Sequence, residues 1–237
     1  MKKICILLVL IISASANAQW FSTKVKGNGN MVTKNRTVDE YDKVSVAGSF
    51  DVKLVSGKEG NLTIHIDENL LEYLITEVEG DNLKIKWEKG VNISSNSKIL
   101  ITVPYEDIEA VSLAGSGDVY NEGTIKAQSF KSALAGSGDI KLNVQSDYLK
   151  AAIAGSGDIV LSGSSKEFEC SIAGSGDFKG LELNTTNASI SIAGSGDAKL
   201  GVSDNLKVRV SGSGDVVYNG NPKQDVKISG SGSVRSN

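Results

Sequence analysis

The stretch Ala135-Gly136-Ser137-Gly138-Asp139-Ile140 contains a tetrapeptide, Gly-Ser-Gly-Asp, that recurs through the second half of the chain. Successive copies begin 18 to 21 residues apart. A nearly fixed period of this length is typical of an architecture built by stacking repeats. Six copies begin at Gly115, Gly136, Gly155, Gly174, Gly194 and Gly212, and a seventh, at Gly230, ends in Ser233 instead of Asp.

Apolar residues alternate with small or charged residues on both sides of every tetrapeptide. This period of two predicts a strand on each side of a tight turn, with one apolar face. One such unit cannot bury its own apolar face, so we expect the units to stack into an all-β fold, a parallel β-helix. Two residues before the first glycine stand Leu113, Leu134, Ile153, Ile172, Ile192, Val210 and Ile228, and four residues after it stand Val119, Ile140, Ile159, Phe178, Ala198, Val216 and Val234.

The tetrapeptide itself predicts the turn. Glycine tolerates the positive φ that few other residues adopt, and the Ser and Asp side chains can hydrogen-bond nearby backbone groups. Small side chains also suit turns that stack roughly 4.8 Å apart. The glycines expected to have this structural role are Gly115, Gly117, Gly136, Gly138, Gly155, Gly157, Gly174, Gly176, Gly194, Gly196, Gly212 and Gly214.

The first half of the chain shows the same pattern in imperfect form. Residues 47–51, Ala-Gly-Ser-Phe-Asp, predict a first coil in which Phe50 replaces the second glycine. Residues 67–79 lose the period of two and place leucines at helical spacing. This segment predicts a short helix or an irregular crossover, with Asp67 as its N-terminal cap.

These patterns divide the chain into segments. A polar stretch at 90–98 predicts a loop between two strands, and Pro104 is expected to end the second strand because proline cannot continue a central ladder. The expected organisation is a signal peptide at 1–18, a polar leader arm at 19–39 that is at best partly ordered, and one β-helical domain at 40–237, irregular up to residue 110 and regular from residue 111.

The first eighteen residues have the pattern of a secretory signal. Lys2 and Lys3 precede an apolar run at 4–12, and Ala16-Asn17-Ala18 forms a cleavage site. The apolar run is too short to cross a bilayer, and no later segment is long enough. We therefore expect an exported protein without a transmembrane segment, located in the periplasm, at the outer-membrane surface or outside the cell.

The composition restricts the chemistry available to the exported chain. Loss of Lys2 and Lys3 changes the formal net charge from −3 to −5, which argues against nucleic acid as a partner. Cys170 is then the single cysteine and falls at an inward position, so no intramolecular disulfide is expected. The single histidine, His65, falls at an outward position, which leaves little material for a zinc site or a Ser-His triad.

Three short stretches and the repeat series, in this order after a signal peptide, carry a family resemblance. The stretches are 46–52 (Val-Ala-Gly-Ser-Phe-Asp-Val), 67–73 (Asp-Glu-Asn-Leu-Leu-Glu-Tyr) and 89–93 (Lys-Gly-Val-Asn-Ile). Along nearly its whole exported length the chain resembles the auto-transporter adhesin head, GIN-domain family, a Bacteroidetes family with no established activity. The resemblance implies a right-handed, pectin-lyase-like β-helix and a role in adhesion at the cell surface.

The aspartates of the tetrapeptides are the first candidate site. Stacked turns would place neighbouring carboxylates about 5 Å apart, and each like-charge pair would then cost on the order of 1 kcal/mol in water. One interpretation is that every carboxylate bonds turn N–H groups and faces solvent, without metal or cofactor. The alternative is a row of Ca²⁺ ions between successive oxygens. The residues concerned are Asp118, Asp139, Asp158, Asp177, Asp197 and Asp215.

The serines between the glycines are predicted to fill the turns. No base accompanies them, so they are not expected to act as nucleophiles. Together with the aspartates they could form a polar stripe suited to a repetitive ligand such as a glycan, although the aromatic residues that could stack on sugars are scattered. The serines are Ser116, Ser137, Ser156, Ser175, Ser195 and Ser213, and the aromatic residues are Trp20, Trp87, Tyr73, Tyr105, Tyr120, Tyr148 and Tyr218.

These observations favour an exported, non-enzymatic envelope or surface protein that acts in adhesion or as a scaffold for an envelope protein or glycan. The alternative class is a polysaccharide lyase or hydrolase, which needs a local, asymmetric cluster of acids. The repeated acids are evenly spaced, and the one asymmetric acidic patch comprises Glu68, Glu72, Glu77 and Glu79.

The last coil raises a further question of assembly. A strand at the end of a stack exposes unpaired backbone groups that need to be covered or protected. We expect this end either to form a homo-oligomer or to rely on the charges of Lys227 and Arg235 as protection.

Overall fold

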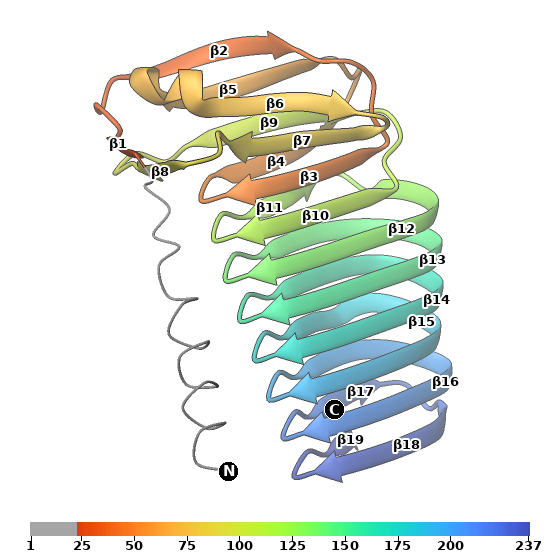
Figure 1. The fold of residues 1–237 in the computed structure, drawn as a ribbon. Helices are drawn as coiled ribbons and strands as arrows, with labels where there is room; N and C mark the ends of the chain where they lie inside the picture. Colours follow the sequence, from red (N-terminus) through yellow and green to blue (C-terminus); the bar gives the residue numbers. More distant parts are fainter. Residues whose placement is uncertain (1–22) are drawn as a thin grey trace, which may run out of the picture.

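The computed structural model describes residues 23–237, and the predicted signal peptide lies outside them. Figure 1 shows a column of stacked coils that is closed at one end by a separate group of strands. The described part of the chain is all-β apart from one short 3-10 helix. Within residues 23–237, no helix is long and apolar enough to cross a membrane.

The regular coils form the long part of the column (Figure 1). In each complete coil, a long strand leads into the Gly-Ser-Gly-Asp turn and the next strand leaves it. Consecutive coils pair in parallel throughout. The strands are β10 (Ala110–Gly115), β11 (Val119–Glu122), β12 (Ile125–Gly136), β13 (Ile140–Gly155), β14 (Ile159–Gly174), β15 (Phe178–Gly194), β16 (Ala198–Gly212), β17 (Val216–Asn219), β18 (Lys223–Gly230) and β19 (Val234–Ser236).

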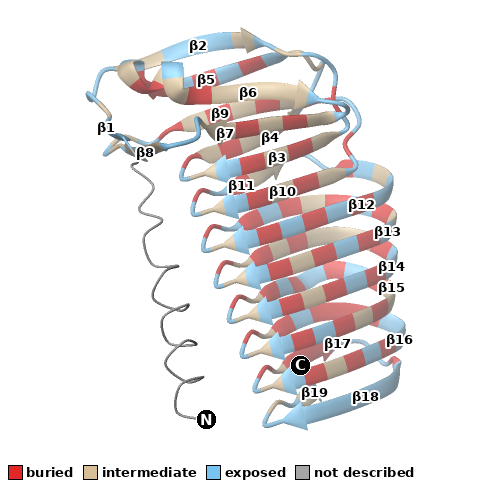
Figure 2. Ribbon diagram, viewed as in Figure 1, coloured by how far each residue is buried: buried red, intermediate tan, exposed pale blue. Residues whose placement is uncertain are grey.

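The repeat register predicted from the sequence is confirmed. Leu134 pairs with Ile153, and the first glycine of each turn pairs with the first glycine of the next turn. Buried and exposed residues alternate along the strands, which Figure 2 shows as stripes, and the buried rows form one continuous core. Cys170 is fully buried in this core, and its burial raises the pKa of the thiol.

The first coil is also confirmed, and it consists of β3 (Lys43–Gly48) and β4 (Asp51–Ser56). Gly48 pairs in parallel register with Gly115 of the next coil. The ring of Phe50 is buried and meets Trp87 edge to face, with 5.3 Å between the ring centroids. Phe50 therefore belongs to the core at the place where the regular turns have their second glycine.

An antiparallel cap closes the column above the first coil (Figure 1). β7 and β9 continue the parallel stack on β3 and β4. β6 then pairs antiparallel with β7, β5 antiparallel with β9, and β2 antiparallel with β5. The cap comprises β2 (Met31–Thr37), β5 (Asn61–Asp67), the 3-10 helix η1 (Glu68–Tyr73), β6 (Leu74–Glu79), β7 (Asn82–Trp87) and β9 (Leu100–Tyr105).

The expected leader arm and the expected loop are ordered as strands. Residues of the leader arm form β2 and a further strand, β1 (Thr23–Lys26), which pairs in parallel with β8 (Val91–Ser94). β8 lies inside the segment at 90–98 that was expected to be a loop. Each strand is stabilised by a partner that is distant in the sequence, so its local polar composition gave the wrong prediction.

Two expectations about single residues of the cap were also wrong. Pro104 does not end its strand but lies within β9, which continues to Tyr105. Asp67 makes no capping bond to η1. Its carboxylate is buried and accepts hydrogen bonds from the backbone N–H of Gly29, at 2.7 Å, and from the hydroxyl of Ser95. Asp67 thus joins three segments of the cap.

Candidate functional site

The aspartates of the turns form a hydrogen-bonded column along the stack. In each turn, carboxylate oxygen Oδ1 accepts the backbone N–H of the equivalent residue in the next coil. The column begins at Asp51 of the first coil and ends at Ser233. The N···O distances are 2.8–3.1 Å for the acceptors Asp51, Asp118, Asp139, Asp158, Asp177, Asp197 and Asp215.

Positive groups accompany this column at two of its aspartates. Lys98 forms an ion pair with Asp51 at 3.0 Å, and Lys179 forms one with Asp158. Partial burial would raise the pKa of Asp158, but the Lys179 ammonium and the Asp177 N–H together hold it below its usual range. The N–H donors and the lysines supply the compensation that a row of like charges requires.

The main chain of the turns is hydrogen-bonded in the same repeating way. The carbonyl oxygen of Gly136 accepts both the Ser156 N–H, at 2.9 Å, and the Gly157 N–H, at 3.0 Å. The serine side chains of all the turns point to solvent and are exposed. Within residues 23–237, no group of three or more His, Cys, Asp or Glu is arranged to hold a metal ion. The aspartate carboxylates and the glycine carbonyls thus form one repeating network of hydrogen bonds to backbone N–H groups.

The asymmetric acidic patch of the sequence is also occupied by local contacts. Glu68 accepts a hydrogen bond from Asn30 at 2.7 Å. Glu77 pairs with Lys86 at 2.6 Å, and Glu79 pairs with Lys84. His65 is exposed on β5, with its Nδ1 3.0 Å from the Thr33 hydroxyl. Glu68 thus joins η1 to the segment before β2, Glu77 and Glu79 join β6 to β7, and His65 joins β5 to β2.

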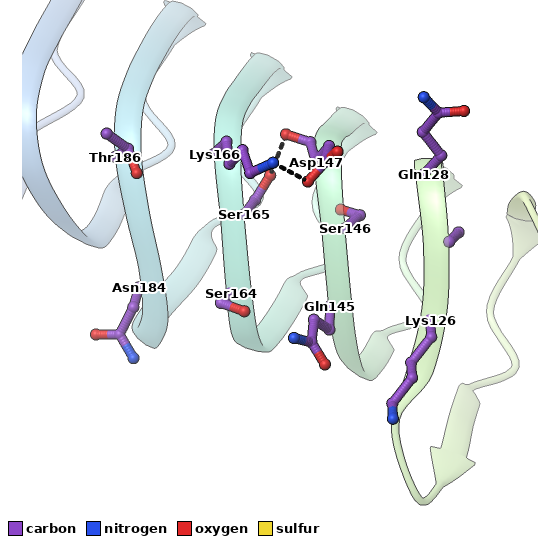
Figure 3. A pocket seen from close by; sticks show the side chains of 11 residues that line it. Lys126, Gln128, Gln145, Ser146, Asp147, Ser164, Ser165, Lys166, Asn184 and Thr186 are labelled. Carbon is purple, nitrogen blue, oxygen red and sulfur yellow. Dashed lines mark hydrogen bonds and ion pairs between the residues drawn. The ribbon is translucent and has the colours of Figure 1, made fainter.

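A shallow groove runs across the coils on the side of the column, where the long strands bend. Its volume is about 720 Å³, and β12, β13, β14 and β15 each contribute to it. Figure 3 shows one rim formed by Lys126, Gln145, Ser164 and Asn184 and the other by Gln128, Asp147, Lys166 and Thr186. Asp147 and Lys166 are joined across adjacent coils by an ion pair of 2.8 Å. All of these groups can donate or accept hydrogen bonds.

A row of buried hydroxyls, from Ser146, Ser165 and Thr185, underlies this groove; those of Ser165 and Thr185 bond the backbone at the bend, whereas that of Ser146 has no hydrogen-bond partner among the described residues. The Ser165 hydroxyl is 2.9 Å from the carbonyl oxygen of Glu167, and that of Thr185 is 2.6 Å from the carbonyl oxygen of Gly201. These contacts satisfy backbone groups where the strands change direction. The sequence did contain a signal for the row, because Ser146, Ser165 and Thr185 each stand nine residues before the next turn.

Tyr148 stands beside the groove and is 58% exposed, the largest value among the exposed large hydrophobic residues of the described chain. It lies next to Asp147 and also lines a second groove of about 610 Å³, together with Lys131, Lys150 and Glu169. Tyr148 therefore forms a ridge between two hollows. The sequence pattern gave Tyr148, seven residues before Gly155, no role beyond that of one scattered aromatic residue.

Polar side chains continue the ridge from Tyr148 toward the last coil. Strand pairing aligns Tyr148 with Glu167 and Glu167 with Asn187. Asn187 donates to Glu167 at 2.6 Å, and Asn205 donates to Asn187 at 2.7 Å. The side of the column thus presents one aromatic ring followed by a row of amide and carboxylate groups at the spacing of the coils.

The fold and this lateral surface define the chain as a parallel β-helix with a groove crossing its coils. The chain belongs to the family described as "Putative auto-transporter adhesin, head GIN domain", whose model matches residues 40–222. The family expected from the sequence is therefore confirmed. A comparison with curated proteins finds no significant match.

Solved structures of similar fold come from Bacteroides and Parabacteroides species. A "putative adhesin" of Bacteroides fragilis has a TM-score of 0.81 and 19% identity, over 90% of this chain and 100% of that one. A "putative lipid binding protein" of Parabacteroides distasonis has a TM-score of 0.73 and 26% identity, over 91% and 100%. A "putative adhesin" of Parabacteroides merdae has a TM-score of 0.67 and 24% identity, over 91% and 100%.

Proposed function

We propose that this protein is an exported, non-enzymatic binding domain whose lateral groove holds an extended polar polymer, in the simplest case a glycan. The observation that carries the proposal is the exposed ring of Tyr148 between two hollows lined with hydrogen-bonding side chains. A tyrosine ring offers an apolar face to the C–H face of a sugar and keeps its hydroxyl for water or ligand.

The repeat gives such a groove a suitable geometry for a polymer. Coils stack at roughly 4.8 Å, so equivalent side chains recur at this interval along the column. Lys126, Gln145, Ser164 and Asn184 on one rim can each contact successive parts of one chain-like ligand. The adhesin names of the family and of two similar structures agree with a binding role at the cell surface.

The carboxylates near the groove support binding more than chemistry. A glycosidase needs two carboxyl groups that flank the scissile bond. Here Asp147 is paired with Lys166, Glu169 with Lys150 at 3.1 Å, and Glu167 with Asn187. Each of these carboxylates is bonded to a side chain of an adjacent coil. Such fixed carboxylates are suited to a polar binding surface.

A glycan array followed by calorimetry on its best ligands tests the proposal. Tyr148→Ala should weaken binding about tenfold, because loss of an aromatic contact costs about 1–1.5 kcal/mol. Tyr120→Ala is the matched control, since Tyr120 lies in β11 and lines neither groove. The proposal fails if no glycan binds, if both variants bind equally, or if the protein releases new reducing ends from the ligand.

A further inference from the structure

The last coil exposes an apolar row that every other coil buries. Val226 and Ile228 are 36% and 40% exposed, whereas Val208 and Val210, their partners in the coil above, are 0% and 3% exposed. Figure 2 shows β18 as exposed along its whole length. β18 pairs with β16 on one edge, and within residues 23–237 no other strand pairs with its second edge. This edge offers unpaired backbone groups together with apolar side chains.

The opposite end of the column is built differently. There the antiparallel strands β2, β5 and β6 cover the parallel stack, and Arg36 fastens β2 to the carbonyl oxygens of Leu71 and Leu74. A second molecule stacked head to tail would have to place its parallel coil on this antiparallel cap. We call the last coil, with the free edge of β18, the open end. The surface that best matches it is therefore the open end of a second copy, related by a two-fold axis that makes the two β18 strands antiparallel.

Side-chain alternation restricts the register of such a pair. The apolar residues of both strands must lie on the same face, so Val226 can pair only with a residue of its own parity. When Val226 lies on the two-fold axis, Asp225 of each copy stands opposite Lys227 of the other copy. A shift of two residues one way places Lys227 opposite Lys227, and a shift the other way places Asp225 opposite Asp225. Opposite charges favour the central register, and like charges disfavour both shifts.

The rim of the open end is already arranged for this pairing. Arg209, one coil above, donates to the backbone carbonyl oxygen of Asp225 at 2.8 Å and to its carboxylate at 2.5 Å. The Asp225 side chain is nevertheless more than half exposed, at 59%. Its carboxylate is thus held in place and remains accessible to a second cation.

We propose that two copies of this chain dock end to end through β18, antiparallel and centred on Val226, and so form one continuous column with a cap at each outer end. Only β18 and β19 of each copy form the contact. The dimer is therefore reversible, and its fraction increases with the protein concentration. It carries two lateral grooves, which increases the avidity for a polymer that reaches both. The dimer does not depend on the chemical identity of the groove's ligand.

Light scattering or sedimentation over a concentration series, with paired charge variants, tests the dimer and its register. Asp225→Lys places Lys opposite Lys227, and Lys227→Asp places Asp opposite Asp225, so each variant alone should be monomeric. An equimolar mixture of the two variants should form heterodimers, because every cross-strand pair is then again of opposite charge. Recovery in the mixture also shows that both variants are folded.

Lys141→Asp is the matched control, since it makes the same charge change as Lys227→Asp on an exposed residue of β13 that lines neither groove and lies far from the end. This variant should dimerise like the parent chain. A parent chain that stays monomeric at every concentration overturns the proposal. Variants that dimerise alone as well as they do in the mixture overturn the register.

Discussion

The regular coils and the N-terminal cap both bury a continuous core, but different groups stabilise them. In the coils, the same backbone contacts recur at each turn, and the side chains near them are small. In the cap, single polar side chains, such as Asp67 and Arg36, join segments that are far apart in the sequence. The coils therefore depend on how closely backbones can approach, whereas the cap depends on individual hydrogen bonds.

The largest expected effect comes from a substitution that separates two turns. Gly155 has φ of +131°, and a Cβ placed there would lie against the carbonyl oxygen of Gly136, inside contact distance. Gly155→Ala should therefore cost roughly 3–5 kcal/mol of unfolding free energy. Gly123 also has a positive φ, of +81°, but open space around its Cβ position, so Gly123→Ala should cost only about 1–2 kcal/mol. Denaturant titration of both variants measures the difference, and equal losses would refute the backbone-approach explanation.

The second effect tests the cap. Asp67→Ala leaves the partly buried N–H of Gly29 without its acceptor and leaves the Ser95 hydroxyl with only the Ser97 carbonyl oxygen, at 3.2 Å, so it should cost roughly 2–3 kcal/mol. Asp67→Asn keeps one acceptor oxygen and should cost clearly less. Thermal unfolding of the two variants separates the loss of hydrogen bonds from a change in packing. If the alanine variant unfolds with the parent chain, Asp67 does not join the cap.

A third change should stabilise the coils. Ser132 occupies an inward position of the core, is 1% exposed, and its hydroxyl has no hydrogen-bond partner among the described residues. Ser132→Ala removes this unpaired polar group and should raise the unfolding free energy by about 1 kcal/mol. Ser112→Ala is a suitable control, because the Ser112 hydroxyl is bonded to that of Ser45 at 2.9 Å and should not give a gain.

The smallest effect concerns one carboxylate of the turn column. Asp158→Asn keeps an oxygen that can accept the Asp177 N–H and loses the ion pair with Lys179, which at a partly exposed position contributes only about 0–1 kcal/mol. The pKa of Asp158 is lowered in the folded protein, so its contribution to stability is complete above the unfolded-state pKa and falls as the pH decreases through the folded-state value. The variant and the parent chain should therefore converge in stability in acid, as measured by unfolding at a series of pH values.

The sequence predicted the coils well because the same alternation of apolar residues around a Gly-Ser-Gly-Asp turn is repeated many times along it. The position of Ile153 is repeated by Leu134, Ile172 and Ile192, so the alternation and the register follow from several independent copies. The cap has no such redundancy. The pairing of β1 with β8 and the contacts of Asp67 each occur once and join segments tens of residues apart, which local patterns do not encode.

The candidate site was predicted only in part, for a related reason. The repeated Asp and Ser residues were predicted as candidate site residues because they are periodic. The structure places them in turns, where each aspartate accepts the N–H of the equivalent residue in the next coil. Tyr148 occurs once in its column, between Ser129 and Glu167, so the repeat gave it no emphasis. Its exposure depends on the bend of the long strands, where consecutive residues 147 and 148 both point away from the core.

The most direct test of the central claim, that the aspartate column holds backbone N–H groups and not cations, is thermal unfolding with and without millimolar Ca²⁺. Parent chain and Asp158→Asn should each show the same unfolding temperature in Ca²⁺ as in chelator, and calorimetry should detect no heat of binding. A rise in the unfolding temperature of the parent chain with Ca²⁺ that Asp158→Asn reduces would contradict the claim and assign the column to cation binding.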